Sequence, residues 1–182
     1  MVFKVLGKTI DDAAGEALDK GGKLLGLEYP AGRKIDELAK KGNPHAYSFP
    51  IGLKNKPTTN LSYSGVKTSL RLFIEKNPEV LTNKDQYHDV VASYQWCVME
   101  ALMTKLKLVK KSYPKLPVVI GGGVASNSLL RSRLKKEYDN TYMVAPQYCT
   151  DNGAMIAHHA SRIEEQWIPF PECLKLDARA RQ

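Results

Sequence analysis

Residues 118–134 read VVIGGGVASNSLLRSRL, and this stretch decides the fold class. Its short apolar run predicts a buried parallel strand over 117–120, which leads into three glycines at 121–123. A helix is predicted after these glycines, with Ser126 or Asn127 placed to cap its first turn. A strand, a glycine turn and a capped helix form one βα unit, so the sequence predicts a helix-rich α/β protein.

The same unit is a general device for binding a nucleotide or a phosphate. Glycine lets the backbone approach a ligand closely, and the N-terminus of a helix presents N–H groups that its own turns do not use. The pattern matches neither the Rossmann GxGxxG fingerprint nor the Walker GxxxxGK[ST] fingerprint. Nucleotide binding and a purely steric use of glycine in a tight turn are therefore both open.

Helices and short strands alternate over the rest of the chain. Helices are predicted over about 13–26, 33–41, 64–75, 84–112 and 151–165, and strands over 2–6, 61–63 and 141–144. Asp11 and Asp12 are expected to cap the first helix and to charge its first turn, and Thr150 is expected to cap the last helix. The proline-containing residues 43–60 are expected to be irregular or to form a β-hairpin.

Length and composition fit one globular domain, or two small ones. The chain has 182 residues, of which 43% are hydrophobic, and this excludes collagen-like, low-complexity and mostly disordered chains. Its formal net charge of +8 favours a polyanionic partner such as nucleic acid, with a solvated basic surface as the alternative. Three cysteines without a CxxC indicate a reducing compartment, and no apolar run is long enough to predict a transmembrane helix.

A second motif, CTDNGAMIAHHA at residues 149–160, places Asp151 and Asn152 at the N-terminus of a helix. An acid at this position is most often a first-turn acid that interacts favourably with the helix dipole. As a metal ligand Asp151 would need partners, and His158 is two helical turns away, roughly 10 Å. No HExxH is present, so the zincin protease motif is absent.

Two further segments allow both structural and functional interpretations. Asp12, Glu16 and Asp19 fall on one helix face, where they would either pair with Lys20 and Lys23 or recognise ribose hydroxyls. In the segment SYSGVKT at residues 62–68, the lysine would either contact a phosphate or simply follow a turn into a helix.

Five stretches in this order carry a resemblance to a known family. They read TIDDAAGEALDK, LGLEYPAG, SYSGVKTS, GGGVASNSLLR and CTDNGAMIAHH. Together they resemble the carboxyl-terminal half of the tRNA threonylcarbamoyladenosine transferases, formerly called glycoproteases or O-sialoglycoprotein endopeptidases. The resemblance runs from about Lys4 to about Trp167 and is closer to the bacterial and organellar branch of the family.

The resemblance implies a fold and a reaction. The fold is the actin-like ATPase fold, with two RNase-H-like lobes around a nucleotide cleft. Residues 1–166 would be the second lobe, 167–182 a tail, and the amino-terminal lobe would be absent. The reaction moves a threonylcarbamoyl group from its adenylate to the exocyclic amine of an adenosine next to the tRNA anticodon.

The resemblance also implies site residues, a metal and partners. Positions that hold the nucleotide of threonylcarbamoyl-adenylate, or an ATP-like nucleotide, match Asp19, Gly32, Asp36 and Asn127, and we group Gly122 and Gly123 of the glycine turn with them. Asp151 matches the aspartate that completes a divalent metal site, iron or zinc, which would polarise and orient the threonylcarbamoyl group. The implied partners are tRNA and other proteins of the pathway, without a membrane, and a homodimer is a further expectation. The compartment would be the cytoplasm in a bacterium, or an organelle in a eukaryote.

The chain departs from the family in lacking the HxxxH motif that supplies two metal-binding histidines. Because one aspartate does not hold a catalytic metal, the chain alone is expected to bind metal poorly and to be inactive. Two alternatives are kept. The first is the older assignment as a metal-dependent endopeptidase. The second is a non-catalytic lobe that docks nucleotide or tRNA, with the basic segments Lys105–Lys115 and Arg131–Lys136 as its surface.

Overall fold

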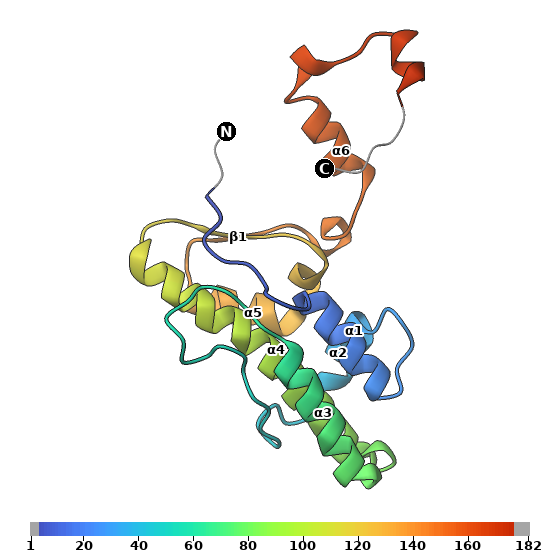
Figure 1. The fold of residues 1–182 in the computed structure, drawn as a ribbon, viewed down its shortest axis with the longest axis vertical. Helices are drawn as coiled ribbons and strands as arrows, with labels where there is room; N and C mark the ends of the chain where they lie inside the picture. The colour runs from blue at the N-terminus through green and yellow to red at the C-terminus, as the bar shows by residue number, and fades with distance from the viewer. Residues whose placement is uncertain (1–3, 177–182) are drawn as a thin grey trace.

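The computed structural model describes residues 4–176 and confirms a helix-rich α/β architecture (Figure 1). The α-helices are α1 (Ala14–Leu24), α2 (Gly32–Ala39), α3 (Ser64–Lys76), α4 (Lys84–Ser112), α5 (Ser128–Glu137) and α6 (Gly153–Ala160). The strands are β1 (Val118–Ile120) and β2 (Thr141–Met143). Short 3-10 turns are η1 (Pro78–Leu81), η2 (Gly123–Ser126), η3 (Pro146–Tyr148), η4 (Glu164–Gln166) and η5 (Glu172–Lys175).

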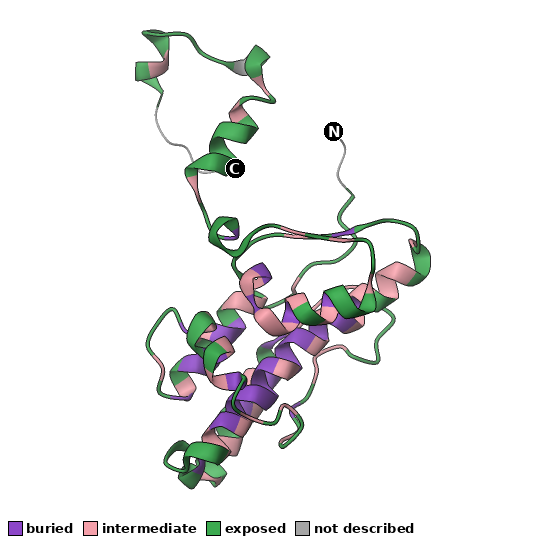
Figure 2. Cartoon of the chain, turned by 180° about the vertical axis from the view of Figure 1, so that it is seen from behind, coloured by how far each residue is buried: buried purple, intermediate pink, exposed green. Residues whose placement is uncertain are grey.

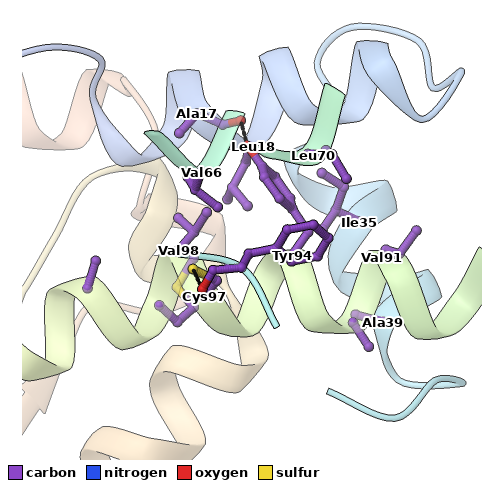
Figure 3. Packing of buried hydrophobic residues seen from close by; sticks show 14 of the residues in the cluster. Ala17, Leu18, Ile35, Ala39, Val66, Leu70, Val91, Tyr94, Cys97 and Val98 are labelled. Carbon is purple, nitrogen blue, oxygen red and sulfur yellow. Dashed lines mark hydrogen bonds between the residues drawn. The ribbon is translucent and has the colours of Figure 1, made fainter. Parts of the chain in front are cut away.

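The long helix α4 is the axis of the molecule, and its predicted bounds of 84–112 are confirmed. Asn83 caps it by accepting hydrogen bonds from the N–H groups of Asp85 and Gln86. Helices α1, α2, α3 and α5 all pack on α4, whose buried residues form the centre of one hydrophobic core. Figure 3 shows Tyr94 of α4 reaching α1, where its hydroxyl donates to the carbonyl oxygen of Ala17 at 2.6 Å.

The predicted βα unit is confirmed, but its strand is only partly buried. β1 and β2 are parallel, with Val118 opposite Thr141 and Val119 opposite Tyr142. Val119 is 68% exposed and Tyr142 is 61% exposed, so the prediction of a wholly buried strand was wrong. The reason is that the helices cover one face of this two-stranded sheet and leave the other face open (Figure 2).

The strands predicted near the N-terminus and before α3 reduce to a single bridge. Residues 2–3 lie outside the described part of the chain, and residues 4–8 form no strand. The backbone of Thr9 bridges Leu61 in parallel, and the N–H of Ile10 donates to the carbonyl oxygen of Leu61 at 2.9 Å. Residues 43–60 are irregular, and the alternative of a β-hairpin is not observed.

Two of the predicted helix caps were wrong. Ala13 is the N-cap of α1, and the side chain of Glu16 accepts a hydrogen bond from its N–H, because Asp11 and Asp12 are engaged elsewhere. At the last helix Asn152 rather than Thr150 is the cap, and it accepts a hydrogen bond from the N–H of Met155 at 3.0 Å.

The chain from α6 to residue 176 lies apart from the helical body (Figure 1), and α6 has no buried residue. It carries exposed apolar side chains, namely Met155, Ile156, Trp167, Ile168, Phe170, Leu174 and Leu176. Residues 177–182 of the predicted tail lie outside the described chain. The homodimer expected from the sequence also stays a prediction. Within residues 4–176 no helix is long and apolar enough to cross a membrane.

Asp11 caps a helix to which it does not belong. Its carboxylate accepts hydrogen bonds from the N–H of Tyr63 at 2.7 Å, the N–H of Ser64 at 3.3 Å and the hydroxyl of Ser62 at 2.5 Å. These groups form the start of α3, so Asp11 joins the segment before α1 to α3. Desolvation raises the pKa of Asp11, but the hydrogen bonds outweigh it and hold that pKa at about 2.

We expect Asp11→Ala to lower the free energy of unfolding by about 1–2 kcal/mol at neutral pH, because α3 loses its cap. The pKa of Asp11 is lower in the folded state than the usual 3.8, so its contribution is complete above that value and is lost as the pH falls toward about 2. Urea unfolding across this pH range should therefore show the gap between the two proteins closing. Asp139→Ala, in an exposed turn, is the control, and an equal loss in both variants would contradict the assignment.

Candidate functional site

The structure brings together Asp19 and Gly32, two of the predicted nucleotide-binding residues. Oδ1 of Asp19 on α1 accepts hydrogen bonds from the N–H of Ala31 at 2.8 Å and of Gly32 at 3.2 Å. The carboxylate thus sits on the N-terminus of α2. The expected Glu16–Lys20 pair is present at 2.6 Å, whereas the Asp19–Lys23 pair is not formed in the described structure. The reason is that Asp19 is directed to the backbone of α2.

Asp36 on α2 makes the same kind of contact with the start of α5. Both of its oxygens lie 3.2 Å from the N–H of Ser128, and Oδ1 accepts a hydrogen bond from the Ser128 hydroxyl at 2.9 Å. Lys40 pairs with the same carboxylate at 3.6 Å. Asp36 therefore contacts the residue that follows Asn127, and its carboxylate already has protein partners.

Asn127 is the N-cap of α5, which settles the choice between Ser126 and Asn127. It is only 6% exposed, and its Oδ1 accepts a hydrogen bond from the N–H of Leu130 at 3.0 Å. Its Nδ2 donates to Oε1 of Gln95 at 3.1 Å, and Gln95 is only 3% exposed. The side chain of Asn127 is thus used inside the protein, where it holds α5 against α4.

Gln95 is the residue beside Asn127 that the sequence did not predict. It lies on the buried face of α4, directly after the core residue Tyr94. A polar side chain at a core position of a long helix needs a partner, because an unpaired buried amide is costly. A glutamine at a core position of α4 therefore indicates a buried hydrogen bond. The sequence does not say which residue is its partner.

The glycine turn borders open space. Gly122 has φ of 82°, a conformation that other residues rarely adopt, so it is required by the turn itself. A Cβ atom at Gly121, Gly123 or Gly32 would meet nothing within 4 Å. A Cβ atom at Gly15 would lie 3.4 Å from Cγ2 of Val124, which places α1 against η2. Backbone conformation therefore explains Gly122, and the open space beside Gly121, Gly123 and Gly32 leaves room for a ligand.

Carboxylates occupy two of the helix N-termini at this site. The expectation that α5 presents free N–H groups to a phosphate is wrong for Ser128, because Asp36 already accepts its hydrogen bond. A phosphate here would be repelled by this carboxylate and by Asp19 at the start of α2. Among the hydrogen bonds of the described residues, Asp19 uses only Oδ1. Its Oδ2 can therefore accept hydrogen bonds from hydroxyl groups of a ligand.

The lysine of SYSGVKT is held in an ion-pair cluster. Lys67 pairs with Asp12, and Lys20 pairs with the same carboxylate at 2.7 Å. Hydrogen bonds from Lys20 and then from Lys67 hold the pKa of Asp12 below its usual range. This pairing favours the structural interpretation of Lys67 over contact with a phosphate.

Asp151 lies apart from the other predicted residues. It is exposed in the turn between η3 and α6, and no hydrogen bond or ion pair in residues 4–176 joins it to the nucleotide group. Nor does this part of the chain contain three or more His, Cys, Asp or Glu side chains grouped to hold a metal ion. Within residues 4–176, Asp151 is therefore not part of a three-ligand group that could hold the implied iron or zinc.

Comparison with known proteins gives one consistent result. Residues 1–158 match the family model described as tRNA N6-adenosine threonylcarbamoyltransferase. The chain is 45% identical over 159 residues to the protein of that name from Kosmotoga olearia, covering 85% of this chain and 46% of the relative. The protein of the same name from Thermosipho africanus is 41% identical over 177 residues, covering 95% of this chain and 53% of the relative. The chain therefore spans about half the length of the curated relatives it matches.

We expect Gln95→Leu to lower the free energy of unfolding by about 1–3 kcal/mol, because it leaves the buried Nδ2 of Asn127 without an acceptor. Urea unfolding followed by circular dichroism measures this loss. Gln86→Leu is the matched control, since Gln86 lies on the same helix and its side chain makes no hydrogen bond to the described residues. Equal stability of Gln95→Leu and the unmodified chain would show that the amide pair contributes nothing.

Proposed function

This chain belongs to the tRNA N6-adenosine threonylcarbamoyltransferase family, and on that premise we propose that it provides the nucleotide-binding part of such an enzyme. The whole protein would transfer a threonylcarbamoyl group from its adenylate to the exocyclic amine of an adenosine in tRNA. The observation that carries the proposal is that Asp19 contacts Gly32 while Asp36 contacts the residue next to Asn127. Four residues separated by up to about a hundred positions in the sequence are thereby linked around α1, α2 and α5.

The proposed fold is the second lobe of an actin-like ATPase. The parallel β1–β2 pair, joined through the glycine turn and α5, is consistent with an RNase-H-like lobe. The whole enzyme would contain a further lobe that closes the nucleotide cleft.

The proposed binding chemistry follows from the free groups of the site. The carboxylate of Asp19 accepts hydrogen bonds from the ribose hydroxyls, and Gly32 gives the sugar room beside it. The open glycine turn at 121–123 lets the base approach the backbone. Asp36 and Asn127 act as positioning residues, because their side chains already hold the start of α5.

The implied metal does not fit the residues of this chain alone. Asp151 is one exposed carboxylate, whereas catalytic zinc sites typically use three protein ligands. The endopeptidase alternative needs the same missing group of ligands, and the relatives are named as transferases. Binding to other proteins of the pathway stays a prediction.

We expect this chain to bind AMP, and Asp19→Asn to weaken the binding at least about tenfold, because the substitution replaces a charged acceptor of ribose hydroxyls with a neutral one. The asparagine keeps an Oδ1 that can accept from Ala31 and Gly32, so α2 should remain capped. Isothermal titration calorimetry gives both affinities. Asp85→Asn, in the first turn of α4, is the matched control for the loss of one carboxylate. Absence of AMP binding by the unmodified chain would refute the proposed function.

We also expect titration of this chain with Zn²⁺ to give weak binding that Asp151→Ala does not change, because one carboxylate is too few ligands for a stable site. Calorimetry with the free ion measures this directly. Tight binding at a ratio of one to one, lost in Asp151→Ala, would show that the chain builds a metal site by itself.

A further inference from the structure

The joined C-terminal ends of α4 and α5 form a strongly basic surface outside the nucleotide site. Lys107 of α4 pairs with Glu137 of α5 at 2.9 Å, and Nζ of Lys110 lies 5.8 Å from the ring centre of Tyr138. These two contacts place the last turns of both helices side by side. We call this region the basic end, defined by residues 107–116 and 133–140.

Several cations in and near the basic end have internal partners. Lys105 is buried and donates to the carbonyl oxygen of Leu53 at 2.6 Å, and Lys110 donates to that of Leu116 at 2.6 Å. Arg131 donates to the carbonyl oxygen of Val144 at 2.9 Å. Arg133 pairs with Glu100 at 2.5 Å and with Glu137 at 3.3 Å. These side chains stabilise the fold and are poorly placed to bind a partner.

Four lysines are left over. Lys111, Lys115, Lys135 and Lys136 are exposed, and none of them forms an ion pair or a side-chain hydrogen bond with residues 4–176. The acids that could balance them are already used, since Glu100 and Glu137 are bound by Arg133 and Lys107. Asp139 is the one acid of the basic end outside these pairs, so the surface has a clear excess of positive charge.

An exposed aromatic side chain adjoins the basic end. The hydroxyl of Thr141 donates to the carbonyl oxygen of Tyr138 at 2.7 Å, so β2 begins directly where α5 ends. The next residue, Tyr142, is 61% exposed on the open face of the sheet, beside the exposed Val119. Lysines next to an exposed aromatic ring can bind RNA, through phosphate contacts and base stacking.

We propose that the basic end is an RNA-docking surface, in which Lys111, Lys115, Lys135 and Lys136 contact phosphates and Tyr142 stacks on a base. The proposal rests on the proposed function for the identity of its ligand, a tRNA. Helix α5 connects the two regions, with Asn127 at its start and Lys135 and Lys136 in its last turn. Ten helical residues span about 15 Å, so the lysines would meet nucleotides a few positions from the modified adenosine.

The test is the salt dependence of RNA binding by this chain, measured by fluorescence anisotropy with a labelled tRNA anticodon stem-loop. The test variant replaces Lys111, Lys115, Lys135 and Lys136 with Gln. The control variant replaces four exposed lysines outside the basic end with Gln, so that the net charge changes equally: Lys23, Lys41, Lys76 and Lys84. Each phosphate contact releases condensed counterions, so a plot of log affinity against log salt has a negative slope. The test variant should make this slope less steep by about 2–3.

At about 100 mM salt we expect the test variant to bind the RNA at least about tenfold more weakly, and the control to change affinity less than about threefold. Tyr142→Ser should weaken binding about fivefold or more without altering the salt slope. Equal losses in the test and control variants, or no RNA binding by the unmodified chain, would overturn the proposal. An unchanged affinity of Tyr142→Ser would overturn the stacking contact.

AMP binding by the same proteins separates this proposal from the proposed function. The test variant should bind AMP as the unmodified chain does, because its lysines lie at the other end of α5. Binding of AMP without binding of RNA would refute the docking surface alone. Binding of RNA without binding of AMP would refute the nucleotide site, and with it the assignment of the RNA as a tRNA substrate.

Discussion

Three aspartate carboxylates, each bound to the N-terminus of a helix that comes later in the chain, link segments that are separated in the sequence. Asp11 binds the start of α3, Asp19 the start of α2, and Asp36 the start of α5. The first N–H groups of a helix have no partner within the helix, and the helix dipole adds positive potential there. A carboxylate satisfies both at once, so each contact fixes the position of a helix end relative to another segment.

This use of aspartates also sets the chemistry of the candidate site. The carboxylates of Asp19 and Asp36 fill positions where a phosphate would otherwise bind to backbone N–H groups. What remains is an oxygen of Asp19 without a hydrogen bond to the described residues and the open space at Gly32 beside it, which suit hydroxyl groups of a sugar. The proposed site would thus recognise the nucleoside part of a nucleotide, with its phosphates held elsewhere.

The start of α5 is acidic in its surroundings, and the joined last turns of α4 and α5 are basic. The start of α5 is bound by Asp36, whereas its last turn and that of α4 carry lysines without partners among residues 4–176. The separation is about 15 Å, the length of α5. In the proposed reaction the adenylate donor is bound at the acidic end, and the phosphates of the RNA acceptor are bound at the basic end. The two proposals therefore describe two ligands that lie side by side on this chain.

The sequence by itself determined the elements that depend on local interactions. The bounds of α4, the βα unit at 118–137 and the Glu16–Lys20 pair were all predicted, because apolar periodicity, turn glycines and pairs one turn apart act over a few residues. Five motifs in a fixed order also indicated the family, but not how their residues act. Only the tertiary structure decided that Asp36 binds Ser128, that Gln95 binds Asn127 and that β1 is exposed on one face. A carboxylate or an amide has many possible partners in a sequence, and packing around α4 selects the one that comes within hydrogen-bonding distance.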